Sequence, residues 1–296
     1  MDIALLSVSM NVYSTKRIAE EAEKRGHYIE QIDHSKCSVH LGGSKPRIYL
    51  EEEDITDAFE AIIPRIGAKL TRHGAAIVKQ FEMNGVFSTA RSMGITRARN
   101  KARTLQIMAR KGIPIPKTLF SIDPNTIEAQ IRLLGGPPVV IKLQEGTQGL
   151  GVILAESEKS AKSIIDTFYK MDMGILIQKF IEEAHGEDLR ILVVGNEIVA
   201  SMKRIGAVGE FRANVHRGGR TEQVILSSKE EQMALDAVRH LGLGVAGVDL
   251  IRSNKGPMLL EVNASPGLQG IEATTGVNVA GAIIRYVENN GRKKRR

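Results

Sequence analysis

The segment EVNASPG, residues 261–267, places a carboxylate and a carboxamide two positions apart at the end of an apolar run. The run predicts a strand, and side chains two apart on a strand share one face, so Glu261 and Asn263 point the same way. A second apolar run upstream, VAGVDLI, contains Asp249. If the two runs form a hairpin that turns about Lys255, Asp249 falls opposite Glu261, to within one register step.

Two carboxylates directly opposite each other destabilise a sheet unless a cation lies between them. A divalent cation with oxygen ligands would offset this repulsion, and Asn263 would add a neutral oxygen. Asp, Glu and Asn on two strands suit Mg²⁺, which keeps few protein ligands and completes its shell with water and phosphate oxygens. In the alternative, the register differs and one carboxylate points to solvent.

A glycine-rich segment, EGTQGLG, lies between two predicted strands and contains Gly146, Gly149 and Gly151. It lacks the Gly-Lys-Ser/Thr of a Walker A loop, and it is followed by a strand where a dinucleotide-binding fingerprint has a helix. A glycine-rich hairpin can offer unobstructed backbone N–H groups to phosphates. A hairpin without a ligand is the alternative.

Lys142 interrupts the apolar strand VVIKL and shares a face with Val140. A buried lysine needs an anionic partner, and a phosphate would serve. In the alternative the strand lies at a sheet edge and Lys142 points into solvent. Lys101, on the preceding predicted helix, is a second candidate or an ordinary surface lysine.

Cations are concentrated in one glycine-rich stretch near residue 210. Basic groups on flexible backbone suit phosphate or carboxylate binding, although a solvated loop has the same composition. Asp188, before a predicted strand, is a candidate acceptor for a ribose hydroxyl. The cations are Lys203, Arg204, Arg212, His216, Arg217 and Arg220.

The composition is that of an ordinary soluble protein, with 42% hydrophobic and 25% charged residues among 296. This length predicts two or three lobes. Cys37 is the one cysteine, which excludes an internal disulfide and fits a reducing compartment; we expect a packed or surface thiol in preference to a reactive one. The N-terminal apolar run is short and predicts a strand, and no run reaches the roughly 18 residues of a membrane helix. We therefore expect a cytoplasmic protein.

The formal net charge is +7, and part of it sits in the basic tail 292–296. The tail is either a solvated end or a docking segment for RNA or an acidic partner. Aromatic residues make up 4% and Trp is absent, which argues against a stacking platform for single-stranded nucleic acid.

The elements that must position these side chains fall into two regions. In the first, strand and helix signals alternate as in a small open α/β lobe. It is expected to hold strands at 2–8, 28–32 and 59–63 and helices at 14–25 and 73–84, with Ser14 as a cap and Gly26 as a stop. Residues 85–95 are expected to connect, and Thr96 to cap a long helix that runs through Lys111.

The second region is expected to be richer in hairpins. One hairpin turns at Gly195-Asn196 and the other around Asn254-Lys255-Gly256. Helices are expected at 227–241 and 274–289.

These motifs together resemble the ATP-grasp ligases, and within them the RimK-type glutamate ligases. The resemblance covers essentially the whole chain. It is carried by EVNASPGLQGIEATTG (261–276), FRANVHRGG (211–219), EGTQGLGV (145–152), PRIG (64–67) and QFEMNG (80–85). It implies an α/β fold with a pre-ATP-grasp lobe (1–95), a small central lobe (96–182), a C-terminal lobe (183–290) and a basic tail (291–296), with ATP between the central and C-terminal lobes.

The resemblance also implies roles for individual residues. Lys101 and Lys142 match the nucleotide and phosphate lysines, and Asp188 matches the ribose-binding acid. Related hinges often carry Glu where this chain has Gln178-Lys179, which puts the role of that side chain in question. The hinge that contacts adenine is matched by Gln178, Lys179, Phe180 and Ile181. A nucleotide-contacting segment is matched by Arg212, Ala213 and Asn214. The ligands of Mg²⁺ or Mn²⁺, of which two ions are implied, are matched by Asp249, Glu261 and Asn263.

The implied reaction is ATP-dependent addition of L-glutamate to an acidic protein C-terminus, that of a small-subunit ribosomal protein, through an acylphosphate. Arg190, Arg204 and Arg212 are the candidates for steadying the transferring phosphoryl group or the substrate carboxylates. A homo-oligomer, a tetramer by resemblance, is implied, with no membrane and no sequence-specific nucleic acid as partner. The alternatives are glutamate addition to a deazaflavin or tetrahydromethanopterin cofactor, and an inactive ribosome- or RNA-binding relative.

Overall fold

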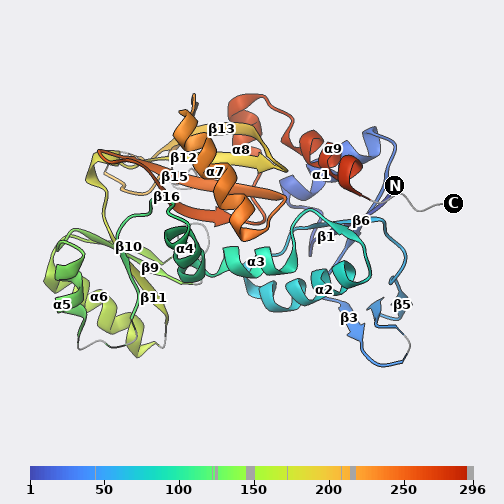
Figure 1. The fold of residues 1–296 in the computed structure, drawn as a ribbon, viewed down its shortest axis with the longest axis horizontal. Helices are drawn as coiled ribbons and strands as arrows, with labels where there is room; N and C mark the ends of the chain where they lie inside the picture. The colour runs from blue at the N-terminus through green and yellow to red at the C-terminus, as the bar shows by residue number, and fades with distance from the viewer. Residues whose placement is uncertain are drawn as a thin grey trace.

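The computed structural model contains four sheets with helices packed on their faces (Figure 1). It describes residues 1–296 apart from 44, 122, 124–125, 145–150, 172, 208, 214–217 and 292–296. The glycine positions Gly146 and Gly149, the segment from Asn214 to Arg217 and the basic tail therefore lie outside the described residues. No helix among the described residues is both long enough and apolar enough to cross a membrane.

The N-terminal sheet is parallel, with strand order β2-β1-β6-β7. Alternating side chains of β1 enter two different hydrophobic clusters, since Ile3 and Leu5 pack with helix α1 whereas Ala4 and Leu6 pack with α2. The two helices therefore cover opposite faces of the sheet. The bounds are β1 Asp2–Leu6, β2 Tyr28–Ile32, β6 Ala61–Pro64, β7 Phe87–Ser88, α1 Tyr13–Lys24 and α2 Thr71–Met83.

The predicted strands and helices of this region are present, but the capping prediction is wrong. Val12 is the N-cap of α1, and Ser14 lies inside the helix. The Ser14 hydroxyl accepts a hydrogen bond from the backbone N–H of Leu268 instead, at 2.9 Å. Its polar side chain thus serves a contact 254 residues away in the chain.

A small antiparallel sheet projects beside the N-terminal sheet and contains Cys37 (Figure 1). Cys37 is buried, and burial raises the pKa of its thiol to about 11. A thiol with a raised pKa is a poor nucleophile, so the expectation of a packed cysteine fits. The strands are β3 Cys37–His40, β4 Arg47–Leu50 and β5 Glu53–Asp54.

His34, next to this small sheet, is expected to make the protein acid-sensitive. It is fully buried, and neither ring nitrogen has a hydrogen-bond partner among the described residues. Burial lowers the pKa of His34; Asp33 opposes the shift and His73 adds to it. An unfolded histidine titrates near pH 6.5, so below about that pH the unfolded chain binds more protons and stability falls.

The His34→Leu variant is therefore expected to lose less melting temperature than the native protein between pH 7 and pH 5. Thermal unfolding across this range measures the effect. His40→Leu, which removes an exposed histidine from β3, is the matched control and should keep the native profile. Identical pH profiles for His34→Leu and the native protein would refute the prediction.

The segment 85–111 forms two helices and a short strand where we expected a connection and one long helix. Helix α3, Ser92–Arg99, begins inside the expected connection and ends before Asn100. Asn100 adopts an extended conformation, and its side chain accepts from the Arg103 N–H to cap α4, Lys101–Arg110. Thr96 is not a cap, because its hydroxyl donates to the Ser92 carbonyl within α3.

The second sheet is small and has a hydrophobic cluster of its own. Its strand order is β10-β9-β11-β8, so β9 is an interior strand and the edge-strand alternative for Lys142 is wrong. The buried members of the cluster all lie between Ile127 and Ile177. The elements are β8 Thr118–Leu119, α5 Ile127–Leu133, β9 Val139–Leu143, β10 Val152–Ala155, α6 Glu158–Lys170 and β11 Ile175–Lys179.

The third sheet is antiparallel with the order β14-β13-β12-β15-β16. Helix α7 packs on the face that carries Ile191 and Val248, and α8 and α9 pack on the face that carries Leu192 and Val245. Helix α9 also packs on α1, which joins this sheet to the N-terminal sheet. The bounds are β12 Glu187–Val194, β13 Glu197–Ile205, β14 Arg220–Gln223, α7 Ser228–Leu241, β15 Val245–Ser253, β16 Gly256–Asn263, α8 Gln269–Thr275 and α9 Val279–Asn290.

Both predicted hairpins are confirmed, and the last predicted helix, 274–289, corresponds to α9, which begins only at Val279 because residues 274 and 275 end α8. Gly276 has a φ of 69° and ends α8 in the left-handed conformation. The side chain of Asn278 then accepts from the Gly281 N–H and caps α9. A left-handed glycine followed by a capping Asn is the usual signature of such a break.

Candidate active site

Four charged side chains lie on one face of the third sheet, the face that carries α8. Asp249 on β15 accepts from the Nε and Nη2 of Arg190 on β12, the latter at 2.8 Å. Arg204 on β13 donates to Asp249 Oδ2 at 2.9 Å and, through Nε and Nη2, to both oxygens of Asp188 at 2.6 and 2.7 Å. The four residues form a chain in the order Asp188, Arg204, Asp249 and Arg190, with carboxylates and guanidinium groups alternating.

Burial and pairing shift these carboxyl groups in opposite directions. Burial raises the pKa of Asp249, but Arg190 and Arg204 outweigh it and hold that pKa below its usual range. Asp188 has only Arg204 as a direct partner, and burial raises its pKa to about 6. Two of the three arginines that we expected to face substrate, Arg190 and Arg204, are thus paired with the two aspartates in this structure.

Glu261 faces Asp249 across the hairpin, as the register prediction required. The ladder shifts register immediately after Asp249, between Asp249 and Leu250. Glu261 accepts a hydrogen bond from the side-chain amide of Asn263 at 3.1 Å, and its carboxylate pairs with no cation among the described residues. It is the uncommitted anion of the site.

These residues fit a divalent cation of the Mg²⁺ type. Glu261 and Asn263 offer oxygens that no arginine covers, whereas both oxygens of Asp249 are shared with Arg190 and Arg204. The described residues contain no group of three or more His, Cys, Asp or Glu side chains arranged around one ion. Few protein ligands, with water and phosphate completing the shell, is the coordination that Mg²⁺ favours.

Lys142 belongs to the second sheet, the one with the order β10-β9-β11-β8, and it lies near the same site. Its Nζ donates to the side-chain carbonyl of Gln178 at 2.7 Å, and the Gln178 amide donates to Thr118 Oγ1 at 2.9 Å. Burial lowers the pKa of Lys142, and the Glu261 carboxylate is the strongest of the charges that oppose this shift. The charge of a carboxylate on β16 thus acts on a lysine of β9, which belongs to a different sheet.

Two of the other predicted nucleotide-binding residues, Lys101 and Gln178, lie near Lys142, and the rest of the predicted hinge continues along and beyond the end of β11. Lys101, the first residue of α4, is close enough for its charge to lower the pKa of Lys142. Gln178 is buried at the end of β11, with its side chain directed toward Lys142 rather than into solvent. The Phe180 ring contacts the Phe211 ring edge-on, with the ring centroids 6.2 Å apart, and Ile181 is the next residue in the chain. Lys179 donates to the Gly136 carbonyl at 3.1 Å.

Arg212 connects the third sheet to the glycine-rich hairpin. It donates to both oxygens of Glu210, at 2.9 and 2.7 Å, and to the Val152 carbonyl on β10 at 3.1 Å. Gly151 ends the glycine segment with a φ of 73°, a conformation that favours glycine. Ala213 is buried beside Arg212. Arg212 is thus held against the strand that follows the glycine segment.

Arg65, within the PRIG segment, is a charged residue of this region to which the sequence analysis assigned no role. It follows β6 directly, and its Nη2 donates to the Pro266 carbonyl at 2.7 Å, one residue beyond Ser265 of the NASPG segment. An arginine immediately after the wholly apolar run AII-Pro is the signal that would have identified it, since parallel strands gather functional residues at their carboxyl ends.

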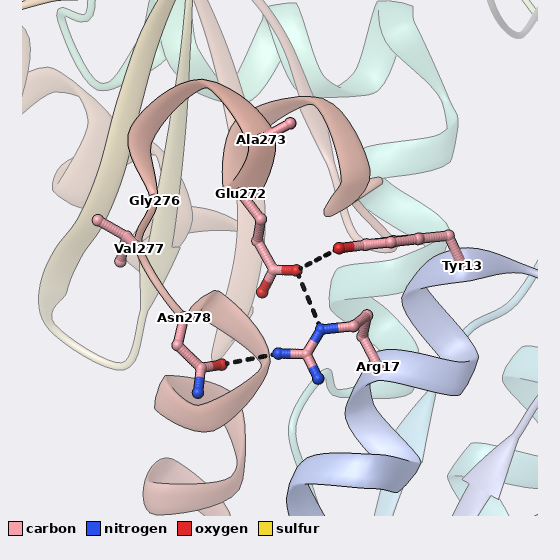
Figure 2. A pocket seen from close by; sticks show the side chains of 7 residues that line it. All are labelled: Tyr13, Arg17, Glu272, Ala273, Gly276, Val277 and Asn278. Atoms are coloured by element: carbon pink, nitrogen blue, oxygen red, sulfur yellow. Dashed lines mark hydrogen bonds and ion pairs between the residues drawn. The ribbon is translucent and has the colours of Figure 1, made fainter.

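An open pocket of about 290 Å³ lies elsewhere, where α1 meets α8 and α9 (Figure 2). Figure 2 shows Arg17 directed between Glu272 and Asn278, with distances of 3.4 Å from Nε to the carboxylate and 3.3 Å from Nη2 to the amide oxygen. Tyr13 donates to Glu272 at 3.1 Å. The polar groups of this pocket bond to one another, so they hold helices together and are not available to a ligand.

Comparison with known proteins finds two family models that together span the chain. Residues 1–95 match a RimK PreATP-grasp domain and residues 98–287 a RimK-like ATP-grasp domain. A protein of Marinobacter nauticus named "Probable alpha-L-glutamate ligase" is 49% identical over 98% of this chain and 96% of its own. One of the same name from Methanococcoides burtonii is 48% identical over 99% and 97%.

Solved structures share the fold at low sequence identity. A RimK domain ATP-grasp protein from Sphaerobacter thermophilus superposes with a TM-score of 0.74 at 22% identity, over 97% of this chain and 99% of its own. The ATP-grasp ligase PsnB, solved with a minimal precursor, Mg and ADP, gives 0.74 at 18% identity over 96% of both chains. These similarities establish an ATP-grasp fold of the α/β class.

Proposed function

The chain belongs to the RimK-like ATP-grasp family and is an ATP-dependent ligase, and from this premise we propose that it joins L-glutamate to the C-terminal carboxylate of a protein. ATP and Mg²⁺ are its cofactors. The observation that supports the proposed site is that Lys142, on interior strand β9, lies within reach of the charges of Glu261 and Asp249 on the third sheet. A lysine near carboxylates of another sheet provides the cation and the metal ligands that a polyphosphate requires.

In the proposed reaction, a carboxylate oxygen of the acceptor attacks the γ-phosphorus of ATP, and ADP leaves. The neutral amine of glutamate then attacks the acyl carbon of the acylphosphate, phosphate leaves, and the nitrogen loses one proton to give the amide. Bound Mg²⁺ would supply charge neutralisation at the phosphates, held by Glu261, Asn263 and Asp249. No side chain of the protein needs to act as a nucleophile, so positioning and charge neutralisation do the chemistry.

The remaining residues have supporting roles in this proposal. Lys142 and Lys101 bind phosphate oxygens, and the segment from Gln178 to Ile181 contacts the adenine. Asp188 accepts from the ribose, which requires that Arg204 release one of its oxygens. Arg190 and Arg204 hold Asp249 ionised, and Arg212 positions the glycine hairpin, whose Gly146, Gly149 and Gly151 provide backbone N–H groups for phosphate.

We further propose a small-subunit ribosomal protein as acceptor, a cytoplasmic location and a homo-oligomeric assembly. The lobe boundaries near 95, 182 and 290 belong to the same proposal. The basic surplus of +7 supports it, because ATP, glutamate and an acidic C-terminus are all anions. The basic tail 292–296 would then act in docking to the ribosome.

Mass spectrometry tests the proposed acceptor. The purified protein is incubated with Mg²⁺, ATP, glutamate and a ribosomal protein extract, and we expect one small-subunit protein to gain glutamyl units, with no gain when ATP is omitted. Release of ADP with a deazaflavin or tetrahydromethanopterin acceptor, and no gain on any protein, would refute the protein acceptor and favour a cofactor-modifying ligase.

A further inference from the structure

Arg65 is a cation without an anionic partner among the residues that the structure describes. Its guanidinium group has five N–H donors, and one of them is used, in the 2.7 Å bond to the Pro266 carbonyl. No described carboxylate lies within 4.0 Å of it, unlike Arg190, Arg204 and Arg212, which all have carboxylate partners. Burial lowers the pKa of Arg65 to about 10, with no neighbouring charge that opposes the shift. Arg65 is half-buried, and it lacks the anion that would stabilise a charge partly removed from water.

The position of Arg65 in the N-terminal sheet is one where α/β proteins bind ligands. It lies just beyond the carboxyl end of β6, and its backbone N–H donates to the Leu6 carbonyl at the end of β1. Strands β1 and β6 are neighbours whose following helices, α1 and α2, cover opposite faces of the sheet. Two such strands leave a crevice beyond their carboxyl ends, the usual ligand site of an open α/β sheet.

Arg65 also adjoins the ionic network of the third sheet. Pro266, which it contacts, lies against Gly247 of β15, where a Cβ atom would come within 2.9 Å of the proline ring. The same position is 3.5 Å from the side chain of Arg190. Pro266, whose carbonyl binds Arg65, therefore lies beside Gly247 and near Arg190, which places Arg65 next to the edge of the ionic network.

We propose that Arg65 is a substrate-binding residue that pairs with a carboxylate of the acidic substrate. This inference rests on the proposed function, since that function supplies the substrate. A carboxylate is the ligand of choice because its two oxygens match the planar fork of the guanidinium group. The carboxylate belongs either to free glutamate or to the acidic end of the acceptor, and the experiment below separates the two.

Calorimetry on the full-length protein with saturating ADP and Mg²⁺ tests the pairing directly. The probes are L-glutamate and triglutamate, and the variants are Arg65→Gln and Arg65→Lys. We expect Arg65→Gln to weaken binding of at least one probe by about 10-fold to 100-fold, since hydrogen bonds to charged groups have this strength. Arg65→Lys keeps the charge without the fork and is expected to lie between the native protein and Arg65→Gln.

Lys69→Gln is the matched control, because it removes one positive charge from an exposed position four residues further along the same segment. It should leave the binding of both probes unchanged. The affinity for ADP and the melting temperature of Arg65→Gln are also expected to match the native values, which a merely structural arginine would not allow.

Each outcome decides the inference. Weaker binding of L-glutamate alone assigns the carboxylate to the donor, and weaker binding of triglutamate alone assigns it to the acceptor. Native affinity of Arg65→Gln for both probes, no binding of either probe to the native protein, or an equal loss of ADP affinity overturns the inference. If the native protein binds a probe but transfers no glutamate to any protein, the proposed function fails while the role of Arg65 is still decided by the variants.

Discussion

The Glu261→Gln variant is expected to lose ATP turnover by about 100-fold or more, because it removes the uncommitted anion from the proposed cation site. Glutamine has the shape of glutamate and can still accept the hydrogen bond from Asn263. The charge is what changes. The proposed metal ligand becomes neutral, and Lys142 loses the negative charge that contributes most to raising its pKa. ADP release measured over a range of Mg²⁺ concentrations should show both a lower maximal rate and a higher Mg²⁺ requirement.

The fold is not expected to suffer from this change, since Glu261 pairs with no cation among the described residues. Melting temperatures within a few degrees of the native value would confirm that the loss is chemical. Glu197→Gln, an exposed carboxylate at the start of β13 in the same sheet, is the matched control and should turn over ATP normally. Native, Mg²⁺-dependent turnover in folded Glu261→Gln would remove Glu261 from the metal site.

The register of the last hairpin could be predicted because its determinants are local. The turn around Asn254-Lys255-Gly256 sets the pairing as far as Leu250 with Leu259, and a one-residue register shift beyond that pair brings Asp249 opposite Glu261, within the one step that the prediction allowed. The interior position of Lys142 could be predicted on a similar basis, because a lysine in an apolar strand has few favourable environments. Features that a turn or a single strand determines are readable from sequence.

The partners of the arginines could not be predicted in this way. Arg190 meets Asp249 because β12 and β15 pair antiparallel, over a separation of 59 residues. Arg65 meets Pro266 over 201 residues. No local pattern specifies such pairings, so the sequence indicated a set of cations without saying which would be committed to carboxylates and which would remain for a substrate.

The wrongly predicted helix ends and caps have a different cause, since the local sequence signals at these positions were compatible with more than one structure. Asn100 and Gly276 are common at helix ends, yet the apolar period continues through both positions. Ser14 and Thr96 have the side chains of caps, but one bonds to Leu268 and the other to a carbonyl within its own helix. Tertiary partners, known only after folding, decided these positions.

The Lys142→Met variant is expected to weaken nucleotide binding by about 10-fold to 100-fold, the range for losing a charge-assisted hydrogen bond to phosphate. Methionine has a similar length and no charge, so it occupies the same interior position on β9. Calorimetric titration with ATP and Mg²⁺, in the absence of acceptor so that no transfer follows, measures the change.

The stability of the Lys142→Met variant without nucleotide is expected to match or exceed that of the native protein, although its nucleotide binding is weaker. Burial lowers the pKa of Lys142, so the charged lysine is held at a cost that the nucleotide phosphates would offset and that methionine never incurs. Against this stands the bond to Gln178, whose carbonyl loses its donor, at a cost of about 1 kcal/mol. We therefore expect a melting temperature close to the native one without nucleotide, and a much smaller rise than in the native protein when nucleotide is added.

Lys162→Met is the matched control, because it removes a lysine from the exposed face of α6, where the pair with Glu128 is worth little. It should bind nucleotide as the native protein does. If Lys142→Met also bound ATP with native affinity and showed the full rise in melting temperature, then the lysine between the two sheets would serve only to hold Gln178. The nucleotide would then have to be sought away from Glu261, and the case for a metal at that carboxylate would fall with it.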